Sequence, residues 1–325
     1  MYYNLIKKKM FTPIIFGPVP SRRLGKSLGI NHLPYKTCSY SCIYCQVGKT
    51  KKMEITRQSF CDTDKLILQI KNRMSSLRAD HKKIDYITFV PDGEPTLESQ
   101  LGSFLQELKT IPIPTAVITN GSMLWKPSVR KDLKYADLVS IKVDTCDPIL
   151  WKEINHPHPD LDLDKVLEGI LNFKDNYEGK IITETMLLRG INDQPLANEM
   201  TAKFIHKISP ACAYLSTPTR PPAERKTLPA LPENIAGVHQ VFSEALNRVE
   251  LLITPEEGDF VLRGDVSQEI LNITALHPLS KDKLEKILQD AGEKWKTVDK
   301  LLEDEKLREV HYNGVFFYIR NFIRQ

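Results

Sequence analysis

The sequence predicts an α/β protein with a partial (β/α)6 TIM-like barrel and a small second domain after it. Two observations support this prediction. Apolar runs alternate six times with segments of helical period, which is typical of parallel strands covered by helices. After residue 268 the pattern changes to short helices and a hairpin. We therefore expect a flexible leader over 1–14, a core domain over 15–255 and a C-terminal domain over 268–325.

Six buried strands are expected in the core domain, because each apolar run has the length and β-branched content of a strand. The runs cover 27–32, 84–90, 115–119, 138–144, 180–187 and 213–218. The helical segments between them cover 62–74, 97–109, 128–135, 162–173 and 198–208. A helix over 232–248 and a strand over 251–254 are expected to close the domain.

The C-terminal segment follows a predicted linker over 255–268. Two helices are expected over 280–292 and 295–306, and the first ends at a glycine. A hairpin is expected over 307–320, because Asn313-Gly314 separates two alternating apolar runs. Two helices and a hairpin suggest a winged-helix-like module, and its expected role is to pack on the barrel or dock a protein.

Charge, hydropathy and cysteine content indicate the cellular compartment and the partners to expect. The net charge is +4 with a pI near 8.6, which is compatible with an anionic partner without requiring one. No stretch approaches the length of a membrane span, and the first residues lack a signal sequence. Six cysteines, three of them isolated, are typical of a reducing compartment. We expect a cytoplasmic protein with no membrane contact, a basic leader over 1–9, and Met10 as an alternative start.

Cys38, Cys42 and Cys45 lie in one loop after the first strand candidate. Three thiolates at this spacing can face one centre, and they suit a four-iron–four-sulfur cluster that leaves one iron without a protein ligand. A small molecule can then chelate that iron. A three-cysteine zinc site with a distant histidine and a chance grouping are the alternatives.

The spacing C-x3-C-x-aromatic-C, with Tyr44 at the aromatic position, resembles the signature of the radical S-adenosylmethionine (SAM) superfamily. The resemblance implies a 4Fe-4S cluster on the three cysteines, whose open iron binds the amino and carboxylate groups of SAM. The reduced cluster of such enzymes splits SAM, and a 5′-deoxyadenosyl radical abstracts a hydrogen atom. The resemblance also implies that Tyr44 lies near the adenine, and that a flavodoxin- or ferredoxin-like protein donates the electron.

A second stretch, FVPDGEPTL over 89–97, resembles the G-G-E-P motif of that superfamily. Gly93, Glu94 and Pro95 match the motif, whereas Asp92 replaces its first glycine. The resemblance implies that the motif binds the methionine moiety, with Glu94 near the amine. Read alone, the stretch would be an ordinary turn.

Polar residues on the third and fourth strand candidates are further cofactor candidates. Asn120 follows the third strand, and Ser140, Lys142 and Asp144 alternate with apolar residues on the fourth. This alternation predicts that the polar face looks into the barrel. The resemblance implies ribose and carboxylate contacts for Asn120, Ser140 and Lys142, and an internal hydrogen-bond network is the alternative.

The last two strand candidates are expected to form the substrate side. Glu184 lies within the fifth strand, and Arg220 and Glu224 follow the sixth. A surface ion pair between Arg220 and Glu224 is the alternative. His156 and His158 are expected to be loop residues stiffened by prolines, with metal ligation as the other possibility.

Arg22, Arg23 and Lys26 form a basic cluster before the cysteine loop. These side chains are candidates to hold a phosphate-bearing substrate, and a solvated surface is the alternative.

The passage over 16–48 resembles a radical SAM subgroup related to the tRNA wyosine-synthesis enzymes, and the C-terminal segment resembles the winged-helix module of that subgroup. Those enzymes hold a second cluster on three extra cysteines before the signature, but no cysteine precedes Cys38 here. Cys61, Cys146 and Cys212 are expected to be ordinary core or surface residues.

The substrate hypothesis follows from this subgroup by analogy. The leading candidate is a tRNA nucleoside or another nucleic-acid-derived group, with tRNA as a possible partner. A radical maturase acting on a peptide or cofactor precursor is the second hypothesis, and a non-catalytic iron–sulfur sensor is the third.

Overall fold

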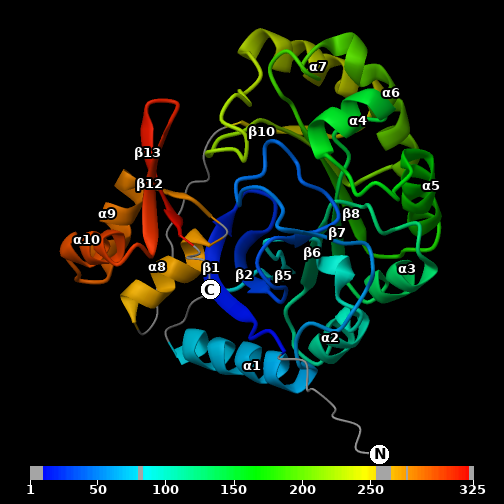
Figure 1. The fold of residues 1–325 in the computed structure, drawn as a ribbon. Coiled ribbons are helices and arrows are strands. Elements are labelled where there is room, and N and C mark those ends of the chain that lie inside the picture. Colours follow the sequence, from blue (N-terminus) through cyan, green and yellow to red (C-terminus); the bar gives the residue numbers. More distant parts are fainter. Residues whose placement is uncertain (1–9, 80–82, 254–264, 276, 322–325) are drawn as a thin grey trace, which may run out of the picture.

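The computed structural model describes residues 10–79, 83–253, 265–275 and 277–321. Its largest element is an eight-stranded sheet with the order β1-β2-β5-β6-β7-β8-β9-β10. All neighbouring strands are parallel except β1 and β2. The sheet lies at the centre of the molecule with helices around it (Figure 1). Because this order is linear within the described ranges, the predicted partial barrel is confirmed.

All six predicted strands of the core domain are present. They are β2 (Gly25–Asn31), β5 (Tyr86–Phe89), β6 (Thr115–Thr119), β7 (Leu138–Lys142), β8 (Lys180–Met186) and β9 (Cys212–Ser216). The strand expected over 251–254 forms as β10 (Val249–Leu252) and pairs with β9.

The predicted helices of the core domain also form. They are α1 (Thr63–Ala79), α2 (Leu101–Leu108), α3 (Pro127–Leu133), α5 (Leu163–Lys174), α6 (Pro195–Ile208) and α7 (Pro232–Ala245). A further helix, α4 (Pro148–Asn155), was not predicted, although Asp147 caps its first turn and Pro148 opens it. No helix in the described part of the chain is long and apolar enough to cross a membrane.

The strand β1 (Ile14–Ser21) was not predicted. The predicted organisation placed a flexible leader over 1–14 and began the sheet at residue 27. The strand β1 pairs antiparallel with β2 at the edge of the sheet. Its prolines and Gly17 hide the alternation of a strand, but an edge strand tolerates proline because one side of its backbone is unpaired. Of the predicted leader, residues 1–9 lie outside the described residues.

The two faces of the barrel strands separate apolar from polar side chains. Val139 and Ile141 of β7 pack with the surrounding helices in the main core. Ser140 and Lys142 point the other way, and Lys142 lines an internal cavity. The predicted polar interior face of this strand is therefore confirmed.

An apolar layer fills the interior at the N-terminal end of the barrel. Leu24, from the turn between β1 and β2, packs there with Leu138, Ile182 and Tyr214. Cys212 belongs to this layer, whereas Cys61 and Cys146 belong to the main core, as expected of ordinary core cysteines. The interior is thus closed at one end and polar at the other.

The C-terminal part contains more elements than predicted. The two expected helices form as α9 (Lys281–Asp290) and α10 (Lys296–Glu303), and the hairpin forms as β12 (Leu307–Tyr312) and β13 (Val315–Arg320). Both turn residues have positive φ, as the Asn-Gly sequence predicts. A helix, α8 (Val266–Thr274), and a short strand, β11 (Leu279–Ser280), were not predicted.

The added helix corrects the linker prediction. Residues 254–264 lie outside the described part, but α8 begins at Val266, so the expected end of the linker at 268 is wrong. The strands β11, β13 and β12 form one small sheet. The winged-helix assignment itself stays a prediction.

The C-terminal part packs on the barrel through β1, as Figure 1 shows. Phe16 and Val19 of β1 lie in one apolar cluster with Ile270 and Ile273 of α8. Tyr312 also donates a hydrogen bond to the carbonyl of Pro218, after β9, at 3.3 Å. The predicted packing role is confirmed, and it brings the C-terminal part to the open side of the sheet.

Candidate functional site

The cysteine loop lies where β2 ends. Its first residues form β3 (Thr37–Cys38), which pairs in parallel with β4 (Lys52–Met53). The amides of Ser41 and Ile43 donate hydrogen bonds to carbonyls at the end of α4, at 2.9 and 3.0 Å. The loop is therefore fixed to the barrel by backbone contacts as well as by side chains.

Each of the three signature sulfurs accepts a hydrogen bond from a side-chain N–H. The donors come from different parts of the fold and therefore fix the three cysteines relative to one another. The contacts are Asn120 Nδ2 to Cys38 Sγ at 3.7 Å, Asn155 Nδ2 to Cys42 Sγ at 3.4 Å, and Lys36 Nζ to Cys45 Sγ at 3.2 Å. Such N–H···S contacts favour thiolates and tune iron–sulfur clusters.

The three signature thiols are partly buried. Burial raises the pKa of Cys38 to about 11 and that of Cys42 to about 12, and the neighbouring thiolates act in the same direction. A coordinating metal deprotonates a thiol outright, so iron replaces the proton at such a site.

The donor set fits a cluster. Among the described residues, no three His, Cys, Asp or Glu side chains surround one point as the ligands of a single metal ion do. A four-iron cluster does not need that arrangement, because each thiolate binds a different iron. Three cysteine thiolates with their own N–H donors thus suit a cluster with one open iron.

The DGEP stretch lies directly against the cysteine loop. A Cβ atom on Gly93 would lie 1.8 Å from the carbonyl oxygen of Thr37, so only glycine fits there. The next amide, of Glu94, donates a hydrogen bond to that same carbonyl at 3.1 Å. The ends of β2 and β5 are thereby joined at the start of the loop. Pro95 begins a short 3-10 helix, Pro95–Leu97, and is buried.

The Glu94 side chain is fully buried, and its carboxylate accepts hydrogen bonds from other residues of the protein. Its Oε1 accepts from the hydroxyls of Thr96 and Thr119, at 2.5 and 2.6 Å, and from the Thr96 amide. Its Oε2 accepts from the Asn120 amide at 2.8 Å. Burial raises the pKa of Glu94, and these hydrogen bonds oppose that rise. The side chain fixes the motif to β6, so its contact with a cofactor amine stays a prediction.

Tyr44 belongs to a group of polar side chains next to the signature cysteines. Its hydroxyl donates to Asp144, which also accepts from Asn155 at 2.8 Å. The Lys142 ammonium lies 5.0 Å from the centre of the Tyr44 ring, within cation–π range. Burial is the main cause that raises the pKa of Tyr44. This group links the cysteine loop to β7.

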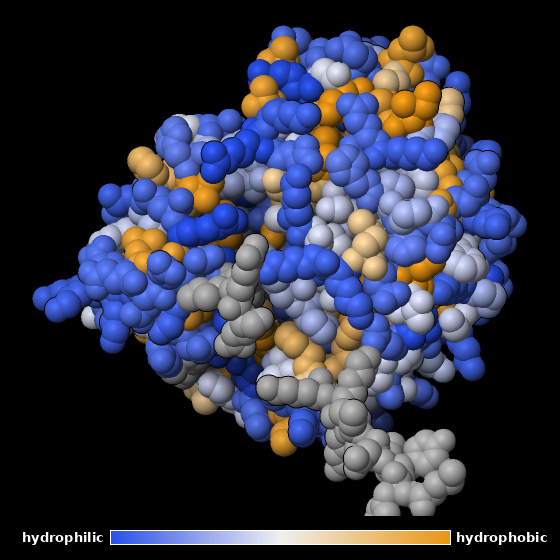
Figure 2. Space-filling view, in the orientation of Figure 1, coloured by the Kyte–Doolittle hydropathy of each residue, from blue (hydrophilic) through white to orange (hydrophobic). Residues whose placement is uncertain are grey.

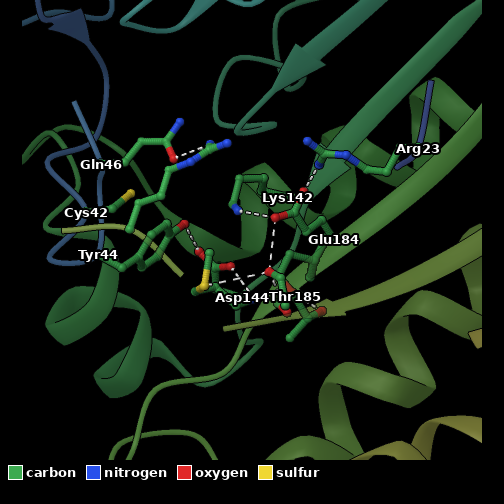
Figure 3. Close-up of polar contacts among 12 residues, drawn as sticks. Arg23, Cys42, Tyr44, Gln46, Lys142, Asp144, Glu184 and Thr185 are labelled. Carbon is green, nitrogen blue, oxygen red and sulfur yellow. Dashed lines mark hydrogen bonds and ion pairs between the residues drawn. The ribbon is translucent and has the colours of Figure 1, made fainter. Parts of the chain in front are cut away.

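A second polar group crosses the barrel interior, as Figure 3 shows. Glu184 of β8 is paired with Arg23, from the turn between β1 and β2, and with Lys142 at 3.2 Å. Ser216 of β9 donates to the same carboxylate at 3.0 Å. Burial lowers the pKa of Lys142, while Asp144 opposes that effect. For Lys142 the alternative of an internal hydrogen-bond network is therefore present, and this network reaches the cysteine loop through the ring of Tyr44.

A cavity of about 270 Å³ lies beside this network. Its wall combines the cysteine loop, the barrel interior, the first hairpin and the C-terminal part. The lining includes Cys45, Gln46, Lys142, Glu184, Arg220 and His277. A small molecule there would touch a signature cysteine and a charged group at once.

The other predicted site residues lie as follows. Asn120 also donates to Ser39 at 2.9 Å, and its amide holds Glu94. The Ser140 hydroxyl is buried in the interior and has no protein hydrogen-bond partner in the described part of the chain. Ser140 is fully buried and is not among the residues that line the cavity, so its contact with a ribose stays a prediction.

Arg220 and Glu224 have partners other than one another. Arg220 donates to Gln46 at 2.9 Å, and Glu224 pairs with Lys49 at 3.2 Å. Both partners belong to the cysteine loop, so the segment after β9 lies on that loop.

The remaining polar candidates separate into cavity and loop residues. Arg22 and Arg23 line the cavity, whereas Lys26 is exposed. His156 ends α4 in the left-handed conformation, and His158 accepts from the Asp160 amide at 3.2 Å. The two histidines are therefore loop residues, as predicted.

Several residues of the site were missed in the sequence. Asn155 lies on the helix α4, which was not predicted, and His277 belongs to a part assigned a packing role. Lys36 precedes the first cysteine by two positions, and that proximity was the only signal. The contact of its ammonium with Cys45 depends on how the loop folds.

Comparisons with known proteins agree with this site. A profile described as the radical SAM superfamily matches residues 33–201. A UPF0026 protein of Methanocaldococcus jannaschii is 43% identical over 310 residues, which cover 95% of this chain and 96% of the relative.

Two solved structures share the fold at low identity. A radical SAM methyltransferase from Sphaerobacter thermophilus aligns with a TM-score of 0.51 and 12% identity, over 70% of this chain and 66% of that one. Streptococcus suis SuiB bound to S-adenosylmethionine aligns with a TM-score of 0.50 and 13% identity, over 75% and 51%. The chain belongs to the radical SAM superfamily, whose members bind a 4Fe-4S cluster and SAM.

The buried hydrogen bonds of Glu94 predict a cost for its amide. In Glu94→Gln, one oxygen becomes an NH₂ group that faces an N–H or O–H donor, which costs about 1–3 kcal/mol of unfolding free energy. Urea unfolding measures this loss. The exposed Glu107→Gln on α2 is the matched control and should change stability by less than about 0.5 kcal/mol. Unchanged stability with lost SAM affinity would instead make the Glu94 carboxylate a direct ligand of SAM.

Proposed function

We propose that this protein is a radical SAM enzyme that holds one 4Fe-4S cluster through Cys38, Cys42 and Cys45. The observation that carries the proposal is the set of three sulfurs, each with its own N–H donor, of which Cys45 lines the cavity. When bound and reduced, the cluster splits SAM into methionine and a 5′-deoxyadenosyl radical.

The residues near the signature cysteines and on β7 suggest how SAM is oriented. Tyr44 presents a ring near the signature cysteines, and Lys142 lies over it with a charge suited to a carboxylate. The orphaned Ser140 hydroxyl can accept or donate a hydrogen bond to a ribose hydroxyl. Asn120 and the backbone of Gly93 and Pro95 complete the proposed SAM side.

The substrate side is proposed around Glu184, Arg220 and Glu224. Arg220 lines the cavity, and Glu184 lies between two cations in its wall. Residues of the β1–β2 hairpin and His277 of the C-terminal part line the same cavity. An external reductant of the flavodoxin or ferredoxin class supplies the electron.

For the substrate, we favour a tRNA nucleoside or another nucleic-acid-derived group. We define the basic rim as loops 46–54, 187–190 and 218–228, which contain seven cationic and two acidic side chains. The whole chain carries only +4, so its positive charge is concentrated on these loops. They contact one another: Lys49 pairs with Glu224, and the Arg189 amide donates to Leu228 at 3.1 Å.

The rim charges suit a phosphate backbone that presents a base to the cavity. Arg225 and Lys226 are exposed there. The molecular face in Figure 2 is mostly hydrophilic, with hydrophobic residues in several separate places, which also suits a polar partner.

The proposed chemistry predicts 5′-deoxyadenosine. Protein purified without oxygen, loaded with iron and sulfide and reduced with dithionite should form it from SAM. The Cys38→Ala, Cys42→Ala and Cys45→Ala variants should each lose at least about 100-fold of this activity, because a missing thiolate removes a cluster ligand. Liquid chromatography with mass detection measures the product.

The core cysteine variant Cys61→Ala is the matched control and should keep the activity. An unreactive wild-type protein that holds a full, reducible cluster and does not bind SAM would contradict the proposal and favour an iron–sulfur sensor.

The basic rim predicts salt-dependent binding of RNA. The double variant Arg225→Gln/Lys226→Gln should bind bulk tRNA more weakly than the wild type. Its slope of log K against log salt concentration should be smaller in magnitude by about 1 to 2, because each lost phosphate contact removes slightly less than one from that slope. Fluorescence anisotropy at several salt concentrations gives the slope.

The control is Lys131→Gln/Lys134→Gln, an exposed pair at α3 on the outside of the barrel. Equal effects of the two double variants, or no tRNA binding by the wild type, would exclude the rim as a nucleic-acid surface.

A further inference from the structure

A buried lysine lies beside the cysteine loop. Lys36 is 2% exposed, and its ammonium donates to Cys45 Sγ at 3.2 Å. Its backbone has a φ of +53°, an uncommon conformation for a residue with a side chain. Its carbonyl accepts hydrogen bonds from the amides of Lys51 and Lys52, both at 3.1 Å. The position of the ammonium is therefore fixed by the fold of the loop.

A buried ammonium is costly unless anionic groups surround it. The groups that face Lys36 are the three signature cysteines, Asp92 and Tyr35. Thiolates bound to iron would supply the negative charge that a buried ammonium needs.

Asp92 supplies the counter-charge from the DGEP stretch. It is 3% exposed, and it occupies the position where the related motif has glycine. Burial raises its pKa to about 7, while the charge of Lys36 opposes the rise. One of its carboxylate oxygens has no hydrogen-bond partner among the described residues. The departure from the motif thus places a buried carboxyl within electrostatic range of both Lys36 and Arg320.

We infer that Lys36 and Asp92 together set the reduction potential of the cluster held by Cys38, Cys42 and Cys45. This inference rests on the proposed function. Reduction adds one electron from the external donor to a site already surrounded by thiolates. A fixed ammonium 3.2 Å from one ligand sulfur, in a buried setting, stabilises the added negative charge and raises the potential. The negative charge of ionised Asp92 opposes this effect.

The two residues should act with opposite signs. Potentiometric titration followed by electron paramagnetic resonance (EPR) measures the potential without any turnover, and about pH 8.5 keeps Asp92 ionised. In Lys36→Met, the ratio of reduced to oxidised cluster at a fixed potential should fall at least tenfold, a downward shift of about 59 mV for one electron. In Asp92→Asn, the same ratio should rise.

The matched control is Lys49→Met. It removes the same charge from the same loop, but its side chain is 68% exposed, so water screens it and the potential should stay as in the wild type. Equal potentials in Lys36→Met, Lys49→Met and the wild type would overturn the inference. If Lys36→Met does not load iron, Asp92→Asn provides the test. A reduction potential in Asp92→Asn that is equal to or lower than the wild-type potential would overturn the inference. A wild-type protein that forms no cluster would instead refute the proposed function.

Discussion

The contact between Gly93 and the carbonyl of Thr37 is the constraint on which the rest of the site depends. It leaves no room for a side chain, so the DGEP stretch and the start of the cysteine loop lie backbone against backbone. Glu94 then ties the same stretch to β6 through the Asn120 amide, and the Asn120 side chain reaches Cys38. The ends of three strands are thereby held in one arrangement before any ligand binds, which is the kind of support that a precise site requires.

The interior of the barrel extends this arrangement. An open sheet leaves one side of its interior uncovered, and here the first hairpin and the C-terminal part pack against that side. Glu184 joins the hairpin to β7 and β9 because Arg23, Lys142 and Ser216 all contact its carboxylate. This group holds two cations and one carboxylate in a buried space, so a charged substrate group would have to exchange partners with it.

Much of the architecture was predictable because its signals are local. Apolar runs gave the parallel strands, and the spacing of the cysteines with Tyr44 gave the cluster loop. The strand β1 was missed because its prolines disguise an edge strand, and α8 was missed because it follows directly on a polar segment. The donors to the sulfurs could not be predicted, since Asn155 and Lys36 reach the cysteines only through tertiary folding. The charge effect of Lys36 on Asp92 likewise joins two segments that look unrelated in sequence.

The central claim is that SAM binds the open iron of this site through its amino and carboxylate groups. The most direct measurement is electron–nuclear double resonance on the reduced protein with SAM labelled with ¹⁵N at the amino group. The account predicts a ¹⁵N hyperfine signal from that nitrogen, which a ¹⁴N signal replaces when SAM is unlabelled. A protein that binds labelled SAM in equilibrium dialysis, yet has no such signal, would contradict it.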